Sequence, residues 1–125
     1  MSVINNSTIQ QFSLPGLAHQ TLASHKDGLN NCEVWMQTVE PGAETPVHYH
    51  DCEEVIVIMS GSGQLSINDK LLEFGPNSTL IIPPDIVHQL VNSGTEEIRL
   101  IASFSSTPAK VFLPDGEELA LPWQS

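Results

Sequence analysis

Residues 42–61 read GAETPVHYHDCEEVIVIMSG, and this stretch does most to decide the fold. His48 and His50 stand two residues apart and are followed by an acidic pair and a long apolar run. In an extended strand, side chains two residues apart point to the same face, so both imidazoles can bind one metal ion. The stretch therefore predicts a β structure that carries a two-histidine metal site.

Two glutamates compete for the place beside these histidines. Glu54 shares the histidines' parity, and a tight turn at residues 51–53 would bring its carboxylate alongside them. We favour Glu54 over Glu53 because Glu54 begins the alternating series with Ile56 and Ile58, which would face the interior. The strand is apolar on both faces, so parity alone leaves this choice open.

A third histidine lies in residues 75–92, which read GPNSTLIIPPDIVHQLVN. Two residues separate His88 from the rigid turn that Pro83, Pro84 and Asp85 predict, and that turn would fix the direction of the imidazole. Taken alone, a histidine among valine and leucine is more often a satisfied core residue than a ligand. His88 becomes a candidate ligand only in combination with the first segment.

The rest of the chain is typical of an antiparallel all-β protein. Short apolar runs alternate with turn signals such as Asp27-Gly28, Asn68-Asp69 and Ser93-Gly94, and no helical periodicity is present. Strands are predicted at residues 9–14, 17–24, 32–40, 54–59, 63–68, 70–74, 78–82, 87–92 and 96–104. A sandwich or barrel follows, with a further turn at Pro114-Asp115-Gly116 in the tail.

The two histidine segments together resemble the cupin superfamily. Its first motif, G-x5-H-x-H-x3-E-x6-G, is matched at every specified position by Gly42, His48, His50, Glu54 and Gly61. Its second motif, G-x5-P-x-G-x2-H-x3-N, is matched at Pro83, His88 and Asn92, with Asn77 and Asp85 at the two glycine positions. Asparagine and aspartate are the non-glycine residues that best tolerate positive φ, so both turns can survive.

The resemblance implies a small single-domain cupin over residues 1–125, with motif 1 at 42–61 and motif 2 at 77–92. Its fold would be an antiparallel jelly-roll β-barrel that holds one divalent transition metal (Fe, Mn, Ni, Co, Cu or Zn) through His48, His50, Glu54 and His88. Four protein ligands leave one or two positions open on the ion. Dioxygenase-like chemistry on a small oxygen-bearing substrate is the leading hypothesis, with Glu54 as a general base.

Two other functions remain as alternatives. One is a non-catalytic module that binds or senses a small ligand, and the other is a cupin isomerase, decarboxylase or lyase, because the fold does not select the reaction. We favour an enzyme over a sensor since the ligand quartet is complete. A homodimer formed through sheet edges is also expected, because exposed edge strands need covering.

Composition limits the partners. The 125 residues suit one domain, and fifteen acidic against four basic residues give a net charge of −11. That charge would repel nucleic acid and anionic lipid, so neither is predicted as a partner. Residues 1–11 lack the features of a secretory signal, which predicts a cytoplasmic location, and Cys32 and Cys52 are then free thiols.

Five further residues receive less specific interpretations. His19 and His25 are predicted to be surface or locally hydrogen-bonded, Tyr49 to pack, and Trp123 to plug one edge of the core rather than stack on a substrate. Cys52 shares the ligands' parity, but its place inside the predicted turn argues against a bond to the metal.

Overall fold

The computed structural model describes residues 2–124 and contains eleven β-strands and two short 3₁₀ helices in that range. The 3₁₀ helices are η1 (Asn6–Thr8) and η2 (His25–Asp27). The strands are β1 (Phe12–Leu14), β2 (Leu17–Ala23), β3 (Glu33–Val39), β4 (Glu54–Ser60), β5 (Gly63–Ile67), β6 (Lys70–Phe74), β7 (Ser78–Ile82), β8 (His88–Val91), β9 (Ile98–Phe104), β10 (Val111–Phe112) and β11 (Glu118–Leu119). Within residues 2–124, no helix is long and apolar enough to cross a membrane.

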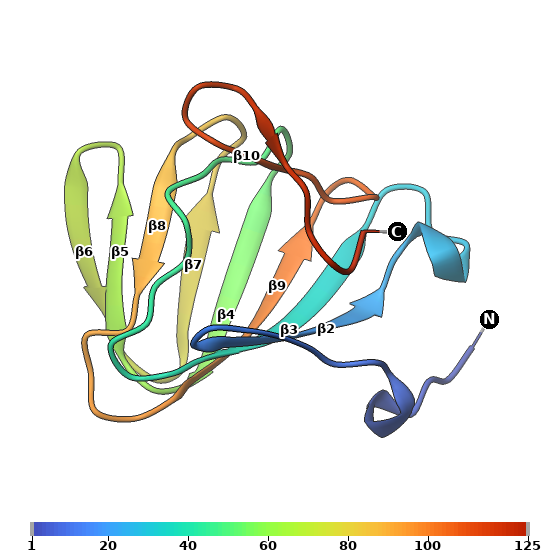
Figure 1. Cartoon of the computed structure of the whole chain (residues 1–125), viewed down its shortest axis with the longest axis horizontal. Helices are drawn as coiled ribbons and strands as arrows, with labels where there is room; N and C mark the ends of the chain where they lie inside the picture. Colours follow the sequence, from blue (N-terminus) through green and yellow to red (C-terminus); the bar gives the residue numbers. More distant parts are fainter. Residues whose placement is uncertain (1, 125) are drawn as a thin grey trace.

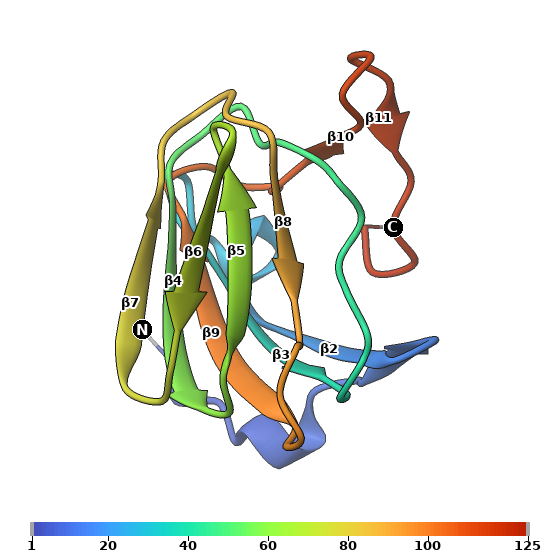
Figure 2. The same cartoon turned by 90° about the vertical axis from the view of Figure 1, so that its left-hand side faces the viewer.

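The strands form two main layers. The larger sheet has the order β1-β2-β3-β9-β4-β7, the smaller has the order β6-β5-β8, and every strand pairing is antiparallel. The smaller sheet lies across the larger one, and the tail hairpin β10-β11 stands at one end (Figures 1 and 2). The predicted jelly-roll architecture is confirmed, and its strand order joins segments that are distant in sequence.

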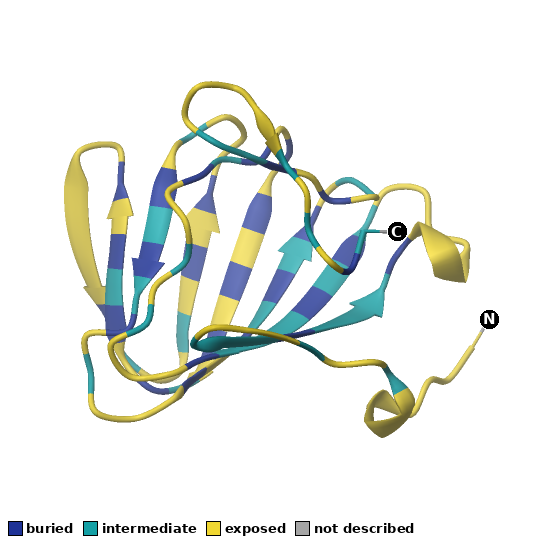
Figure 3. Cartoon of the chain, in the orientation of Figure 1, coloured by how far each residue is buried: buried dark blue, intermediate teal, exposed yellow. Residues whose placement is uncertain are grey.

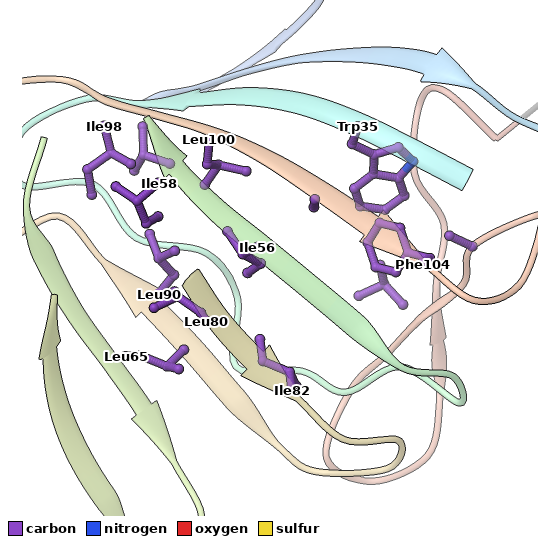
Figure 4. Close-up of a cluster of buried hydrophobic side chains, with 14 of the residues drawn as sticks. Trp35, Ile56, Ile58, Leu65, Leu80, Ile82, Leu90, Ile98, Leu100 and Phe104 are labelled. Carbon is purple, nitrogen blue, oxygen red and sulfur yellow. The ribbon is translucent and has the colours of Figure 1, made fainter. Parts of the chain in front are cut away.

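The core lies between the two layers. Buried and exposed residues alternate along β4 (Figure 3). Glu54, Ile56 and Ile58 are among the buried residues of this strand and point inward. Leu100 from β9 and Leu65 from β5 belong to the same buried cluster, and Figure 4 shows these side chains converging. The alternation follows from the two-residue period of a strand, and it places Glu54 on the inner face where the sequence series predicted it.

Turn chemistry agrees with the sequence at four polar positions. Asn68 (φ 50°) and Asp69 (φ 60°) join β5 to β6 in the left-handed region, as a two-residue hairpin requires. Asn77 (φ 61°) and Asp85 (φ 65°), which replace the glycines of the second cupin motif, also have positive φ. The turns that lead to His88 are therefore preserved without glycine.

Most predicted strands occur within two residues of their expected limits. The first is shorter than expected: β1 begins at Phe12 rather than Ile9, because Ile9 is the C-cap of η1. The N-cap of η1, Asn5, accepts a hydrogen bond from the backbone N–H of Ser7. The last is also shorter, since β9 begins at Ile98 rather than Glu96. The Pro114-Asp115-Gly116 turn joins β10 to β11 as predicted.

Gly61, the last glycine of the first motif, combines a positive φ with close neighbours, and either property could require glycine. Its φ is +85°, and an added Cβ would lie 2.6 Å from the Glu97 carbonyl oxygen and 2.8 Å from Ile98 Cα. Gly28 has a similar φ of +92° but open space around its Cβ position. We expect Gly28→Ala to cost about 1–2 kcal/mol of unfolding free energy from backbone strain, and Gly61→Ala about 1–3 kcal/mol more from overpacking. Urea unfolding of both variants measures this, and equal losses would show that φ alone selects glycine.

Candidate metal centre

Three histidines from two distant segments meet at the inner face of the barrel. His48 lies in the connection from β3 to β4 and pairs with His88, the first residue of β8, through an antiparallel bridge. The bridge has two backbone hydrogen bonds, His48 N to His88 O at 3.0 Å and the reverse at 2.8 Å. His50 follows two residues later, and one ring nitrogen from each of the three histidines lies within 4.8 Å of the others. All three side chains are buried.

Each imidazole is oriented by a hydrogen bond from Nδ1 to a backbone carbonyl. The acceptors are Pro46 for His48 (2.6 Å), Lys110 for His50 (2.8 Å) and Ile86 for His88 (2.9 Å). A carbonyl oxygen only accepts, so Nδ1 must carry the proton in all three rings. In the neutral form, Nε2 is then a lone-pair donor, which is the state that a metal ligand requires.

Glu54 lies beside these nitrogens. Its Oε1 is 3.3 Å from Nε2 of His50 and 3.4 Å from Nε2 of His88, yet it is buried and has no hydrogen-bond partner. These distances exceed those of ordinary N–H···O bonds, so the contacts are electrostatic. A carboxylate oxygen that faces imidazole lone pairs is repelled by them unless a cation or a proton lies between.

Burial and the contacts between Glu54 and the histidines shift the pKa values of the cluster. Burial opposes ionisation of Glu54, but its contacts with His50 and His88 outweigh burial and lower the pKa of the carboxyl to about 2. Burial also disfavours a charged His50, but Glu54 outweighs it and raises the pKa of that imidazole. At His48, burial and the neighbouring histidines lower the pKa to about 4. The site thus combines an ionised carboxylate with at least one neutral imidazole at physiological pH.

These residues fit a divalent metal. Three oriented imidazoles and one carboxylate are ligands that suit a first-row transition ion, and Glu54 Oε1 lacks any other partner within the described chain. Fe, Mn, Co, Ni, Cu and Zn all accept these donors.

The structure also shows which of the residues next to the histidines belong to the site. Glu54 is buried at the site, whereas Glu53 is exposed on the opposite parity, because β4 begins directly after the turn. Cys52 is buried but is not part of the histidine cluster, and burial raises the pKa of its thiol. Tyr49 stacks on Phe112, with ring centroids 5.3 Å apart, as expected of a packing residue.

A cavity of about 110 Å³ opens onto the cluster. Its lining is mostly apolar, and the three histidines and Glu54 form one wall of it. Two tryptophans, Trp35 and Trp123, line it, together with Leu119 and Leu121 from the tail. The sequence did not indicate this contribution from the C-terminal segment, because apolar residues near a terminus carry no signal of what they cover.

Trp123 is held in place by His19. The two rings stack with centroids 3.6 Å apart and an interplanar angle of 10°. The prediction that Trp123 plugs a core edge is confirmed by its burial, but the surface alternative for His19 is wrong, because this ring is 1 % exposed. Gln37 Nε2 donates to His19 Nδ1 at 3.0 Å, so His19 Nε2 donates to Thr21 Oγ1 at 2.7 Å.

Comparison with known proteins identifies the family of the chain. Residues 2–123 match the family model described as auxin binding protein. The chain belongs to the auxin-binding protein family. It is 40 % identical over 112 residues to auxin-binding protein 1 of Arabidopsis thaliana, an alignment that covers 82 % of this chain and 57 % of that protein. It is 37 % identical over 118 residues to auxin-binding protein T85 of Nicotiana tabacum, with 85 % and 63 % covered.

The chain described here therefore spans about three-fifths of the length of these two curated relatives. Among solved structures, the cupin-2 domain Rru_A2000 of Rhodospirillum rubrum superposes with a TM-score of 0.76 at 19 % identity, covering 90 % of this chain and 80 % of that one. At this identity the likeness shows the fold alone, which is the fold that the motif resemblance predicted.

Metal binding can be tested at the histidines. We expect one equivalent of divalent metal per chain, and His48→Ala or His88→Ala to reduce affinity at least 100-fold, because each substitution removes one of four ligands. His25→Ala is the matched control, since His25 is an exposed histidine outside the cluster. Calorimetric titration with Zn²⁺ and Mn²⁺ and elemental analysis measure this. Unchanged affinity in the cluster variants would rule out the site.

The buried, neutral state of His19 should make the stability of the fold depend on pH. Burial lowers its pKa from 6.5 to about 3, so between those values the unfolded chain binds a proton that the folded chain does not. Its contribution is complete above pH 6.5 and falls as the pH drops toward 3. We expect the stability difference between wild type and His19→Gln to shrink by about 2–3 kcal/mol from pH 7 to pH 4.5. Unfolding with chelator present measures it, and a constant difference would contradict a neutral His19.

Proposed function

We propose that this auxin-binding family member binds a small organic carboxylate at a divalent metal held by His48, His50, Glu54 and His88. The observation that carries the proposal is the division of the cavity: nitrogen and oxygen donors converge on one wall, while most other walls are apolar. Ligand sites typically have this composition, with few polar groups in an apolar pocket. When bound, the metal supplies a Lewis acid with open positions for an anionic oxygen.

Charge supports an anionic ligand. Neutral imidazoles and the single carboxylate of Glu54 contribute one negative charge to a divalent ion, so the loaded centre keeps one positive charge. The site is buried, and within it no other charged side chain lines the cavity. An anion that enters would therefore be drawn to the metal wall, while Trp35, Trp123 and the leucines would contact its apolar part.

The size of the cavity limits the ligand. A cavity of about 150 Å³ accommodates benzene, so about 110 Å³ suits a small acid. A ligand with one aromatic ring or more would project through the mouth or displace Leu119, Leu121 or Trp123. The relatives' name states that they bind auxin, and we carry over to this chain the recognition of a small ligand rather than auxin itself.

A second candidate function is the dioxygenase-like enzyme that the sequence suggested. One observation favours catalysis: Glu54 has a buried oxygen without a hydrogen bond, and a carboxylate freed from the metal can take up a proton as a general base. Isomerase, decarboxylase and lyase reactions use a base in the same way, so this observation does not select among them.

Binding can be measured by tryptophan fluorescence, because Trp35 and Trp123 line the cavity. Acetate, benzoate, phenylacetate and indole-3-acetate form a series of increasing size, and benzyl alcohol is a neutral control. We expect carboxylates to bind the metal-loaded protein at least 10-fold more tightly than the chelator-treated protein, and the alcohol to show no such dependence. Metal-independent binding would contradict the proposal.

The same loaded protein separates the two functions. Reconstituted with Fe(II) under air, it is mixed with catechol, diketone and hydroxy-acid panels while dissolved oxygen is recorded. Carboxylate binding without oxygen uptake supports the binding function, and uptake that His88→Ala abolishes supports the dioxygenase.

A further inference from the structure

Glu33 is a buried acidic residue outside the metal cluster. It is the first residue of β3, only 4 % of it is exposed, and it is not among the residues that line the metal-facing cavity. Burial of a carboxylate costs free energy unless hydrogen bonds replace the water that it loses. The partners of those hydrogen bonds therefore indicate what Glu33 does in the molecule.

Both carboxylate oxygens of Glu33 accept hydrogen bonds. Oε2 accepts from Trp35 Nε1 at 2.6 Å. Oε1 accepts from Thr107 Oγ1 at 2.9 Å and from the backbone N–H of Ala109 at 3.2 Å. A carboxylate has two acceptor oxygens and no donor, so it can hold partners on two sides at once. Glu33 thus links a tryptophan of its own strand to the segment between β9 and β10.

The first link fixes the indole of Trp35 on the cavity wall. Trp35 packs on Phe104, with ring centroids 4.5 Å apart (Figure 4), and its ring lies edge-on to His50 at 6.4 Å. An indole has a single N–H donor, and Glu33 accepts it, so Trp35 presents only its apolar ring to the cavity. Glu33 thereby keeps this wall apolar, and the polar atoms of a ligand are left to the metal wall.

The second link leads to a metal ligand. Ala109 donates its N–H to Glu33, and the carbonyl of the next residue, Lys110, accepts from His50 Nδ1 at 2.8 Å. Adjacent residues are joined by a rigid peptide plane, so a displaced Ala109 would carry the Lys110 carbonyl with it. Ala109 is buried, so water cannot replace Glu33 without a local opening of the chain.

From these two links we propose that Glu33 is a positioning residue for both the metal centre and its cavity. One carboxylate sets the Trp35 wall directly and sets the direction of His50 through Ala109 and Lys110. The chain itself makes both links, and only their effect on binding rests on the proposed function. Loss of the Glu33 carboxylate should therefore loosen the cavity wall and one metal ligand together.

Glu33→Met and Thr107→Val test this role in chelator-treated protein. Methionine fills a volume close to that of glutamate but is only a weak acceptor, so both links are lost. Thr107→Val is the matched control, because it removes the one hydrogen bond to Glu33 that leads to neither Trp35 nor His50. Proton–nitrogen NMR records the Trp35 indole N–H and the His50 tautomer. We expect Glu33→Met to shift the indole resonance upfield and to mix the His50 tautomers, and Thr107→Val to change neither.

Metal binding gives a second readout on the same variants. Co²⁺ is the probe, because its visible absorption bands report the geometry of the ligands. We expect Glu33→Met to lower the Co²⁺ affinity about 10-fold and to shift these bands, and Thr107→Val to stay within about 2-fold of wild type. A wild type that binds no Co²⁺ would refute the proposed function, whereas the NMR signals would still decide the role of Glu33.

Two results overturn the proposal. One is a folded Glu33→Met with unchanged NMR signals, and the other is an equal change in Glu33→Met and Thr107→Val, which would show a general role in stability. If Glu33→Met does not fold, the isosteric Glu33→Gln replaces it. Its amide has one acceptor oxygen and can keep only one link, so either the Trp35 indole resonance or the His50 tautomer must change. A folded Glu33→Gln with both signals unchanged overturns the proposal equally.

Discussion

The site depends on three hydrogen bonds that point away from it. Nδ1 of His48, His50 and His88 each donates to a backbone carbonyl, which leaves Nε2 of each ring available to the cluster, and Nε2 of His50 and of His88 faces Glu54. Backbone acceptors are set by the fold itself, so the ligand geometry is prepared before any ion arrives. No carboxylate accepts from these Nδ1 atoms, which leaves Glu54 as the negative charge at the centre.

The fold supplies those carbonyls from three separate places. Pro46 and Ile86 each lie two residues before the histidine they orient, so local chain direction is sufficient for His48 and His88. His50 instead bonds Lys110, sixty residues away, just before β10. The tail hairpin thus has two connections to the site: it orients one ligand through Lys110 and lines the cavity through Leu119. Removal of the tail would therefore disturb the ligands as well as the pocket.

What the sequence could predict was local or encoded in spacing. The series Glu54, Ile56 and Ile58 favoured an inward Glu54, while parity alone left Glu53 as a competitor. The positive φ of Asn77 and Asp85 followed from the residue types that tolerate it. The carbonyl of Lys110 could not be predicted, because backbone atoms leave no mark in side-chain patterns. The burial of His19 was also missed, since its partners Thr21, Gln37 and Trp123 come together only through strand pairing and the folded tail.

The sequence of β4 is apolar on both faces, and the structure shows where each face lies. A strand that is apolar on both faces is normal where both faces are buried, as in sheets covered on two sides. In one chain of this protein, Ile56 and Ile58 on the inner face are buried while Val55 and Val57 on the outer face are not. The amino-acid composition of β4 therefore suits a strand with a second covering layer. On the inner face, the same alternation places Glu54 at the start of the strand, beside His50 and His88.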